Sequence, residues 1–292
     1  MYKITALLLV FITAGAFADT RIEITGVVEW DTLQIKAAVS LDLASAGVRL
    51  PSGRSQGEVI LNDGYLRLIR PGILELQVDS SSTIADLIDR GEFSMIEAER
   101  LALTAHALPP ALSHDMRKMS AFYTVSISGV SSAFLQHSRI APVARTLNPV
   151  STARYTGIII IASESLPVYG MRGETLPIPC LFPKIWDSEM NLIYERNMLK
   201  TGISTMVRYS PPGSIFQQNP SGLSPELLAV VGDRPLRIFA RGVFGVKPTD
   251  LIIDRSDAML IISSDENRRL LSEGKVAIIL DESVLRSEFS GE

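Results

Sequence analysis

Alternation of apolar and polar residues dominates the start of the chain. Residues 22–28 and 33–39 place apolar side chains at roughly every second position. A period of two is typical of a strand with one buried face. We therefore predict two strands joined by a turn over residues 29–32. Residues 121–138 alternate again, at Tyr123, Val125, Ile127 and Val130, and predict one further long strand.

Helical signals lie between these strands. The first predicted helix covers residues 58–69 and ends or kinks at Pro71, because proline cannot continue the hydrogen-bond ladder. A second helix is predicted in residues 80–93, where the hydroxyl of a serine or of Thr83 can cap it. A third is predicted within residues 95–108, where the following prolines stop it.

Continuous apolar runs mark the second part of the chain. Four consecutive isoleucines in "GIIIIA" (157–162) predict a central strand that is buried on both faces. Further strands are predicted at residues 185–186, 192–194, 236–245, 250–255 and 275–281. The first two of these form a hairpin. Residues 166–187 contain too many prolines for continuous pairing and are expected to be extended, and residues 208–235 are expected to be mostly loop.

The most charged stretch, residues 252–283, predicts strand, helix, strand. Ser256 and Asp257 can cap a short turn, and Ser263 with Glu266 has the spacing of a capping box. Gly274 stands where a left-handed helix stop is expected. The charged residues therefore finish secondary-structure elements and need not converge on a reactive pocket.

The fold class predicted from these patterns is α+β, with two β-rich regions, short helices inserted between strands, and mixed sheets. The predicted organisation is a signal peptide at 1–18, an N-terminal α+β domain at 19–138, a linker or crossover at 139–153, a C-terminal β-rich α/β domain at 154–285, and a tail at 286–292.

The first residues and the composition indicate the cellular location of the protein. Lys3, a short apolar run and small residues before Ala18 are typical of a secretory signal cleaved after Ala18. We expect a periplasmic protein with no transmembrane span in the mature chain. A net charge of −4 argues against nucleic acid as a partner. Cys180 is the only cysteine, so no intramolecular disulfide can form, and a buried position is expected for it.

Catalytic chemistry has little support in the sequence. The best acidic candidates are Asp250, Asp254, Asp257 and Asp281. The histidines His106, His114 and His137 have no metal-binding spacing and are expected on the surface or in loops. We expect no enzymatic activity, no cofactor and no metal site. The alternative is a metal-assisted hydrolase in which Asp254 and Asp281 project from one sheet edge.

Long loops and exposed sheet edges suit protein–protein contact instead. The candidate contact residues are Met171, Arg172, Tyr209, Phe216 and Trp186.

Two blocks of the sequence resemble a known protein family. The blocks "YTGIIIIASE…LPIPCLFPKIWDSEMNLIYE" and "RIFARGVFGVKPTDLIIDRSDAMLIISSDENRRLLSEGKVAIILD" are similar to the C-terminal portion of the FlgP-like, LPP-type family of flagellar-associated exported proteins. In the first half, "VDSSSTIADLI" and "YTVSISGV" are similar to that family's first domain. The matching positions in the two blocks are Thr156, Gly157, Pro183, Ile185, Asp187, Asn191, Tyr194, Gly242, Val243, Gly245, Thr249, Asp250, Asp257, Ala258, Asn267, Leu271, Val276 and Asp281.

The resemblance implies an exported, non-enzymatic motility protein. Such a protein is a structural part of the flagellar motor or its assembly, acting through contacts in a ring or disc around the motor. The implied partners are flagellar basal-body or motor proteins and further copies of the chain, as a homo-oligomer. Many relatives are lipoproteins, whereas this chain lacks the lipobox cysteine. The alternative is a cell-envelope module that binds peptidoglycan or another glycan through Trp186 and Tyr194.

Overall fold

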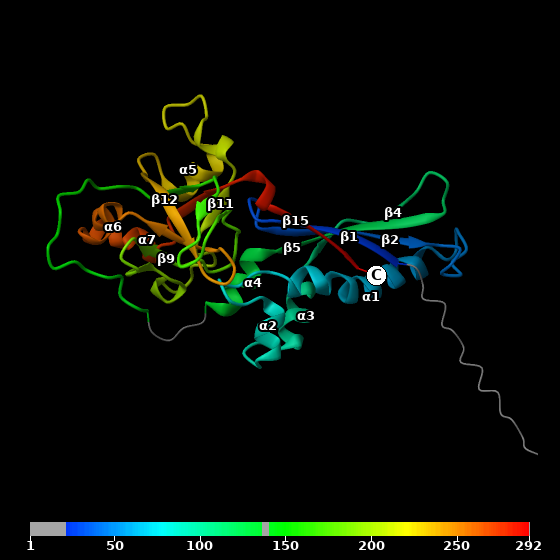
Figure 1. Ribbon diagram of the computed structural model, residues 1–292. Coiled ribbons are helices and arrows are strands. Elements are labelled where there is room, and N and C mark those ends of the chain that lie inside the picture. Colours follow the sequence, from blue (N-terminus) through cyan, green and yellow to red (C-terminus); the bar gives the residue numbers. More distant parts are fainter. Residues whose placement is uncertain (1–21, 136–139, 292) are drawn as a thin grey trace, which may run out of the picture.

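The computed structural model describes residues 22–135 and 140–291 (Figure 1). The predicted signal peptide with Ala18, and His137, lie outside the described residues. Two large sheets and a two-stranded hairpin, with helices between the strands, make up the described part, so the predicted α+β class is confirmed. The first sheet is antiparallel throughout, and the second is mixed.

Six antiparallel strands form the sheet of the first region. In sheet order they are β15 (Arg286–Gly291), β1 (Ile22–Glu29), β2 (Gln34–Asp42), β5 (Lys118–Ser126) and β3 (His106–Ala107), with β4 (Ala111–Leu112) also paired to β5. Residues of β2 and β5 alternate strictly between buried and less buried positions. This confirms the prediction of strands with one buried face.

The long helix α1 (Arg54–Leu74) packs against that buried face (Figure 1). Its buried stripe repeats every four residues, at Leu61, Tyr65, Ile69 and Ile73. The helix is longer than predicted and continues through Pro71, which was expected to end or kink it. Proline removes one helix hydrogen bond, but burial of Ile73 two residues later favours continuation of the helix.

Two short helices pack beside α1. Thr83 caps α2 (Ile84–Asp89) as predicted, accepting from the Asp86 N–H, while the Asp86 side chain accepts from the Thr83 N–H. Helix α3 (Met95–Leu103) begins at an equivalent capping box formed by Ser94 and Glu97. It ends before residue 108, because the chain turns at Thr104 and enters β3.

The long strand predicted over residues 121–138 is only partly correct. β5 ends at Ser126, and the chain then forms α4 (Ile127–Phe134). Ser126 caps this helix by accepting from the Gly129 N–H at 3.4 Å. Ile127 and Val130 are both buried because they are three apart on one helical face. Ile127 also continues the period of two set by Tyr123 and Val125, which explains why a strand was predicted there.

A mixed sheet of seven strands forms the second region. In sheet order they are β10 (Leu192–Tyr194), β9 (Ile185–Asp187), β13 (Asp250–Ile253), β12 (Leu236–Phe244), β6 (Ile158–Ala162), β14 (Val276–Leu280) and β11 (Arg208–Ser210). The isoleucine strand β6 is central, and Ile158, Ile159 and Ile160 are all at most 1% exposed. The predicted central strand and the β9–β10 hairpin are therefore confirmed.

Helices cover this sheet at several points. The segment 208–235, expected to be mostly loop, contains β11, the 3-10 helix η2 (Pro212–Ile215) and α5 (Pro225–Val231). The charged stretch forms α6 (Arg255–Ile262) and α7 (Asp265–Ser272) between β13 and β14.

The predicted caps of the charged stretch shift by a residue or two. Asp254 stands at the N-cap of α6, in place of Ser256 or Asp257. The Ser264 hydroxyl caps α7 in place of Ser263, which bonds the Val150 N–H instead. Gly274 has a φ of 65°, as expected for a left-handed helix stop.

A segment without helix or strand, residues 140–157, leads from the first region into β6. The buried Asn267 side chain holds its last part: its amide donates to the Ala153 carbonyl at 2.9 Å, and its oxygen accepts from the Tyr155 N–H at 3.2 Å. The segment therefore lies against α7.

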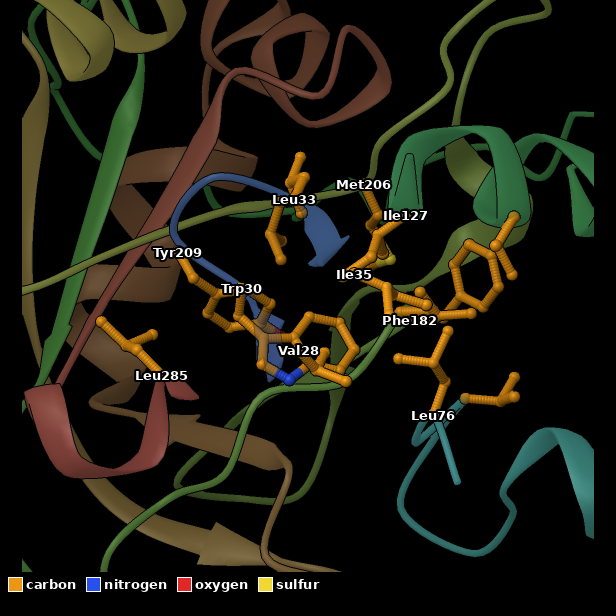
Figure 2. Packing of buried hydrophobic residues seen from close by; sticks show 14 of the residues in the cluster. Val28, Trp30, Leu33, Ile35, Leu76, Ile127, Phe182, Met206, Tyr209 and Leu285 are labelled. Atoms are coloured by element: carbon orange, nitrogen blue, oxygen red, sulfur yellow. The ribbon is translucent and has the colours of Figure 1, made fainter. Parts of the chain in front are cut away.

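The two regions share one hydrophobic core (Figure 2). The Trp30 ring meets the Tyr209 ring edge-on at 5.9 Å between centroids. The N–H groups of Leu181 and Phe182 donate to the carbonyls of Gln77 and Val78, both at 2.9 Å. The regions are thus joined by side-chain packing and by backbone hydrogen bonds.

The C-terminal segment crosses back to the first region. Residues 286–292 were predicted as a tail, but residues 286–291 form β15 and pair with β1 (Figure 1). The Phe289 ring is 8% exposed and fills the space above Gly26 and Gly72, where any Cβ would lie within 3 Å of it. The ring therefore anchors β15 over a strand glycine, Gly26, and a helix glycine, Gly72.

Candidate functional site

The carboxylates proposed as a hydrolase pair lie far apart. β13 is antiparallel to β12, whereas β12, β6 and β14 are parallel to one another. Asp254 follows β13 and Asp281 follows β14, so the two acids lie at opposite ends of the sheet. Asp254 pairs with Arg241 at 2.7 Å, and Asp281 accepts from the Ser283 N–H at 2.9 Å. The expected shared sheet edge for these two acids is therefore wrong.

A buried carboxylate, Asp187, organises the tip of the β9–β10 hairpin. It accepts from the N–H groups of Glu189 and Asn191, at 3.0 and 2.8 Å, and forms an ion pair with Arg255. Burial alone would raise the pKa of Asp187, but the donors from Asn191 and Arg255 outweigh burial and lower it. Asp187 therefore stays ionised and ties the hairpin to the start of α6.

A second buried carboxylate, Asp250, positions Trp186. Its oxygens accept from the Trp186 indole N–H at 3.3 Å and from the Lys184 N–H at 3.1 Å. Burial raises the pKa of Asp250, and these hydrogen bonds only partly oppose the rise. Burial followed by the charge of Asp254 also raises the pKa of Asp257 in α6. Each of these acids has a structural partner or a place on a helix.

Tyr209, one of the predicted contact residues, is buried. It is 2% exposed, its hydroxyl donates to the Cys180 carbonyl at 2.9 Å, and the same oxygen accepts from the Cys180 N–H at 3.1 Å. A separate partner therefore cannot reach it, and its role is to join the two regions through Trp30. Cys180 is buried as predicted, and burial raises the pKa of its thiol.

Met171 and Arg172 lie at an exposed hairpin tip. The hairpin consists of β7 (Leu166–Pro167) and β8 (Glu174–Thr175), and Met171 is 63% exposed. The Tyr169 N–H donates to the Val243 carbonyl at 2.8 Å, which attaches the hairpin to the end of β12. The tip therefore has a defined position on the second region.

Three aromatic rings lie beside this hairpin. We call Tyr169, Phe244 and Trp186 the aromatic row. Phe244 is at the centre, 6.0 Å from the Tyr169 ring and 6.0 Å from the Trp186 ring, with both contacts edge-to-face. Tyr169 is 53% exposed, and Val246, two residues beyond Phe244, is 85% exposed. The predicted contact residues Trp186, Met171 and Arg172 thus lie on or next to one surface.

Phe216, the remaining predicted contact residue, belongs to a different loop. It follows η2, is 76% exposed, and is followed by residues 217–223 (the yellow loop in Figure 1). The adjacent Arg237 guanidinium on β12 donates to the Ser221 carbonyl at 2.9 Å. Phe216 is therefore an exposed ring on a loop that has its own anchoring contact.

The remaining candidates do not assemble into a metal site. His106 and His114 are both exposed, as expected. Over residues 22–135 and 140–291, no three His, Cys, Asp or Glu side chains are placed to hold a metal ion. Within the same ranges, no helix is long and apolar enough to span a membrane.

Sequence reasoning missed Tyr169 and Phe244. Their ring contacts join residues 169, 186 and 244, which are far apart in the chain and have no common periodicity. Trp186 and Phe244 lie in the separate strands β9 and β12, so no local pattern brings them together.

The fold defines a two-region α+β protein in which a shared core joins an antiparallel sheet to a mixed sheet. Residues 21–133 match the family model described as Treponema pallidum Tp0624, N-terminal domain, and residues 157–282 match the model of its second domain. The two regions are therefore similar, in order, to the N-terminal and second domains of this spirochete protein. Neither match names the FlgP-like family. No curated protein matches the chain.

Proposed function

We propose that the chain is an exported structural protein of the periplasm that acts through protein–protein contacts in the flagellar motor or its assembly. The observation that carries the contact function is the aromatic row with Met171 at its side. Aromatic residues and methionine, the types that form the three rings of the row and Met171, are enriched in protein interfaces. The row is held by Asp250 and by the end of β12, so a partner would meet a preorganised surface.

The architecture of the chain is also suited to a structural protein. Its two regions are joined through one core and through backbone bonds, and β15 links the end of the chain back to the first sheet. Such a chain can transmit force between partners through its shared core. The flagellar setting itself rests on the sequence resemblance of residues 155–283 to the FlgP-like family. Assembly as a homo-oligomer in a ring or disc rests on the same resemblance.

Co-purification with intact basal bodies tests this proposal. A strain would express the protein from its own locus as the natural chain, as the double variant Tyr169→Ser, Met171→Ser, or as Leu147→Ser. Leu147 is 97% exposed on the segment 140–157 and serves as a matched control for loss of exposed apolar surface. We expect the natural chain and the control to follow basal bodies, and the double variant to be reduced at least tenfold, with impaired swimming.

The proposal would be wrong if the natural chain did not accompany basal bodies and a deletion strain swam normally with unchanged motor density in cryo-tomography. A folded but non-associating double variant, checked by circular dichroism, separates contact loss from unfolding.

The aromatic row also favours a second candidate, a module that binds peptidoglycan or another glycan. The geometry gives this candidate less support, because the rings meet edge-to-face and present no flat platform. Tyr194, which was expected to contribute, is 0% exposed and donates its hydroxyl to the Met206 carbonyl. A pull-down with purified sacculi distinguishes the two candidates. If the chain binds glycan, it should bind sacculi and Tyr169→Ser should abolish that binding. If it acts in the motor, it need not bind sacculi.

A further inference from the structure

The C-terminal strand β15 offers a free edge of the first sheet. It is the outermost strand and pairs only with β1 in the described sheet. The Leu285 carbonyl accepts from the Trp30 N–H at 3.0 Å. This bond identifies which residues of β15 direct their backbone groups toward β1 and which direct them away. By the two-residue alternation of such ladders, the N–H and C=O groups of Arg286 and Glu288 point away from β1. Unpaired groups of this kind are a template for another strand.

This edge is held in place before any partner arrives. The Phe289 ring occupies the space that a Cβ at Gly26 or Gly72 would need, because the hypothetical Cβ atoms would lie 2.0 and 2.6 Å from its Cζ. The strand is therefore clamped between β1 and α1. A preformed edge lowers the entropic cost of binding an extended segment.

A cavity of about 340 Å³ lies beside the edge. Its wall is built by both regions and by β15 itself, including Val28, Trp30, Leu76, Pro179 and Ser287. Cross-strand neighbours point to the same face of a sheet. A residue paired opposite Ser287 would therefore direct its side chain toward this cavity, whose size is in the range of ligand pockets.

Opposite charges flank Ser287 on the other face of the strand. Arg286 and Glu288 are both exposed, and their Cα partners in β1 are Glu29 and Val27. Glu29 already forms an ion pair with Lys36 at 2.5 Å. A segment antiparallel to β15 would thus be favoured by an acidic residue opposite Arg286 and a basic residue opposite Glu288.

We propose that the edge of β15 and the adjacent cavity bind an extended segment of a partner protein that reads, in chain order, basic, large apolar, acidic. This site rests on the proposed function in protein contact and gives it a second, chemically defined surface. The sequence Arg286-Ser287-Glu288 itself reads basic, small, acidic, so a second copy could match the charges. Its serine would leave the cavity empty, which favours a separate partner over self-pairing.

Fluorescence titration of the full mature chain tests the site. The chain has two tryptophans, and Trp30 lines the cavity, so a Trp186→Phe background makes Trp30 the only reporter. The probe is a synthetic heptapeptide, acetyl-Thr-Thr-Lys-Leu-Glu-Thr-Thr-amide. We expect saturable binding that shifts Trp30 emission. The peptide with Lys and Glu exchanged should bind about tenfold more weakly, and the double variant Arg286→Glu, Glu288→Arg should reverse this preference.

Two N-methylated peptides provide matched controls for the backbone geometry. N-methylation of the lysine removes an N–H that faces the outward groups of Glu288, and should abolish binding. N-methylation of the leucine removes an N–H that points away from β15, and should leave the affinity within threefold.

Three results would overturn the site: no binding of any peptide, equal binding of both charge orders, or equal effects of the two methylations. Sedimentation showing a dimer that Arg286→Glu dissolves would replace the partner segment with a second copy and would also overturn it. Peptide binding, together with failure of the natural chain to follow basal bodies, would count against the motor role alone. Basal-body association without peptide binding would count against this site alone.

Discussion

The two sheets of the molecule bury their strands differently. In the first region α1 covers one face, and the other face carries an open groove of about 720 Å³ lined by β1, β2 and β5, among other residues. In the second region β6 is buried on both sides, because α5 and η2 cover Ile159 while Ile160 faces the shared core. A strand with one covered face tolerates polar residues at every second position, and a strand with two covered faces tolerates almost none.

Alanine substitution of two adjacent residues in each strand should show this difference in burial most strongly. We expect Ile159→Ala and Ile160→Ala each to lower the free energy of unfolding by about 3 to 4 kcal/mol, since both side chains are buried. In β2, Val39→Ala should cost about 2 kcal/mol. Its neighbour Ser40→Ala should change stability by less than about 0.5 kcal/mol. Chemical denaturation measures all four. If either Ile159→Ala or Ile160→Ala left the free energy of unfolding unchanged, β6 would not be buried on both faces.

The first region depends on a strand that follows the second region in the chain. Phe289→Ala should cost about 3 kcal/mol, because the ring fills the space above Gly26 and Gly72. Hydrogen exchange should then report faster exchange in β15 and in the β1 amides paired with it.

Gly26→Ala sharpens the same test, because its new Cβ would collide with the ring. In the Phe289→Ala background that collision disappears, so the two changes should be strongly non-additive. Additive costs would show that the ring does not occupy this space.

Low pH should lower the stability of the second region, because Asp187 becomes protonated. Hydrogen bonds from Asn191 and Arg255 outweigh burial and hold the pKa of Asp187 below its ordinary value of 3.8. The folded pKa is the lower one, so the stabilisation is present above pH 3.8 and is lost as the pH falls through the folded pKa.

Asp187→Asn should therefore cost about 2 kcal/mol near neutral pH and progressively less below about pH 4. Urea denaturation at several pH values measures this. The exposed Asp89→Asn variant is the control, and a cost that does not depend on pH would exclude ionised Asp187 as the stabilising species.

The smallest stability effects are expected at the exposed rings. Phe216→Ser should change the free energy of unfolding by less than about 0.5 kcal/mol, because Phe216 is 76% exposed. A thermal melt of this variant beside Phe289→Ala compares an exposed ring with a buried one. A cost above about 1 kcal/mol would mean that Phe216 packs against the chain and is not free for a partner.

Local periodicity correctly predicted the elements whose burial follows their own sequence. The alternating strands β1 and β2, the isoleucine strand β6 and the Thr83 cap belong to this group. It failed where one residue fits two structures, as at Ile127, which continues the alternation of β5 and also begins the buried face of α4. It also failed where packing overrides a local signal, as at Pro71.

The sequence by itself therefore determined the α+β class, the faces of most strands and the two-part organisation, because these depend on side chains a few residues apart. Only the tertiary structure decided that Asp254 and Asp281 lie at opposite sheet ends, that Tyr209 is buried against Trp30, and that β15 completes the first sheet. It also brought Tyr169, Trp186 and Phe244 together. Strand order and direction create these contacts, and neither quantity is encoded in the local period of the chain.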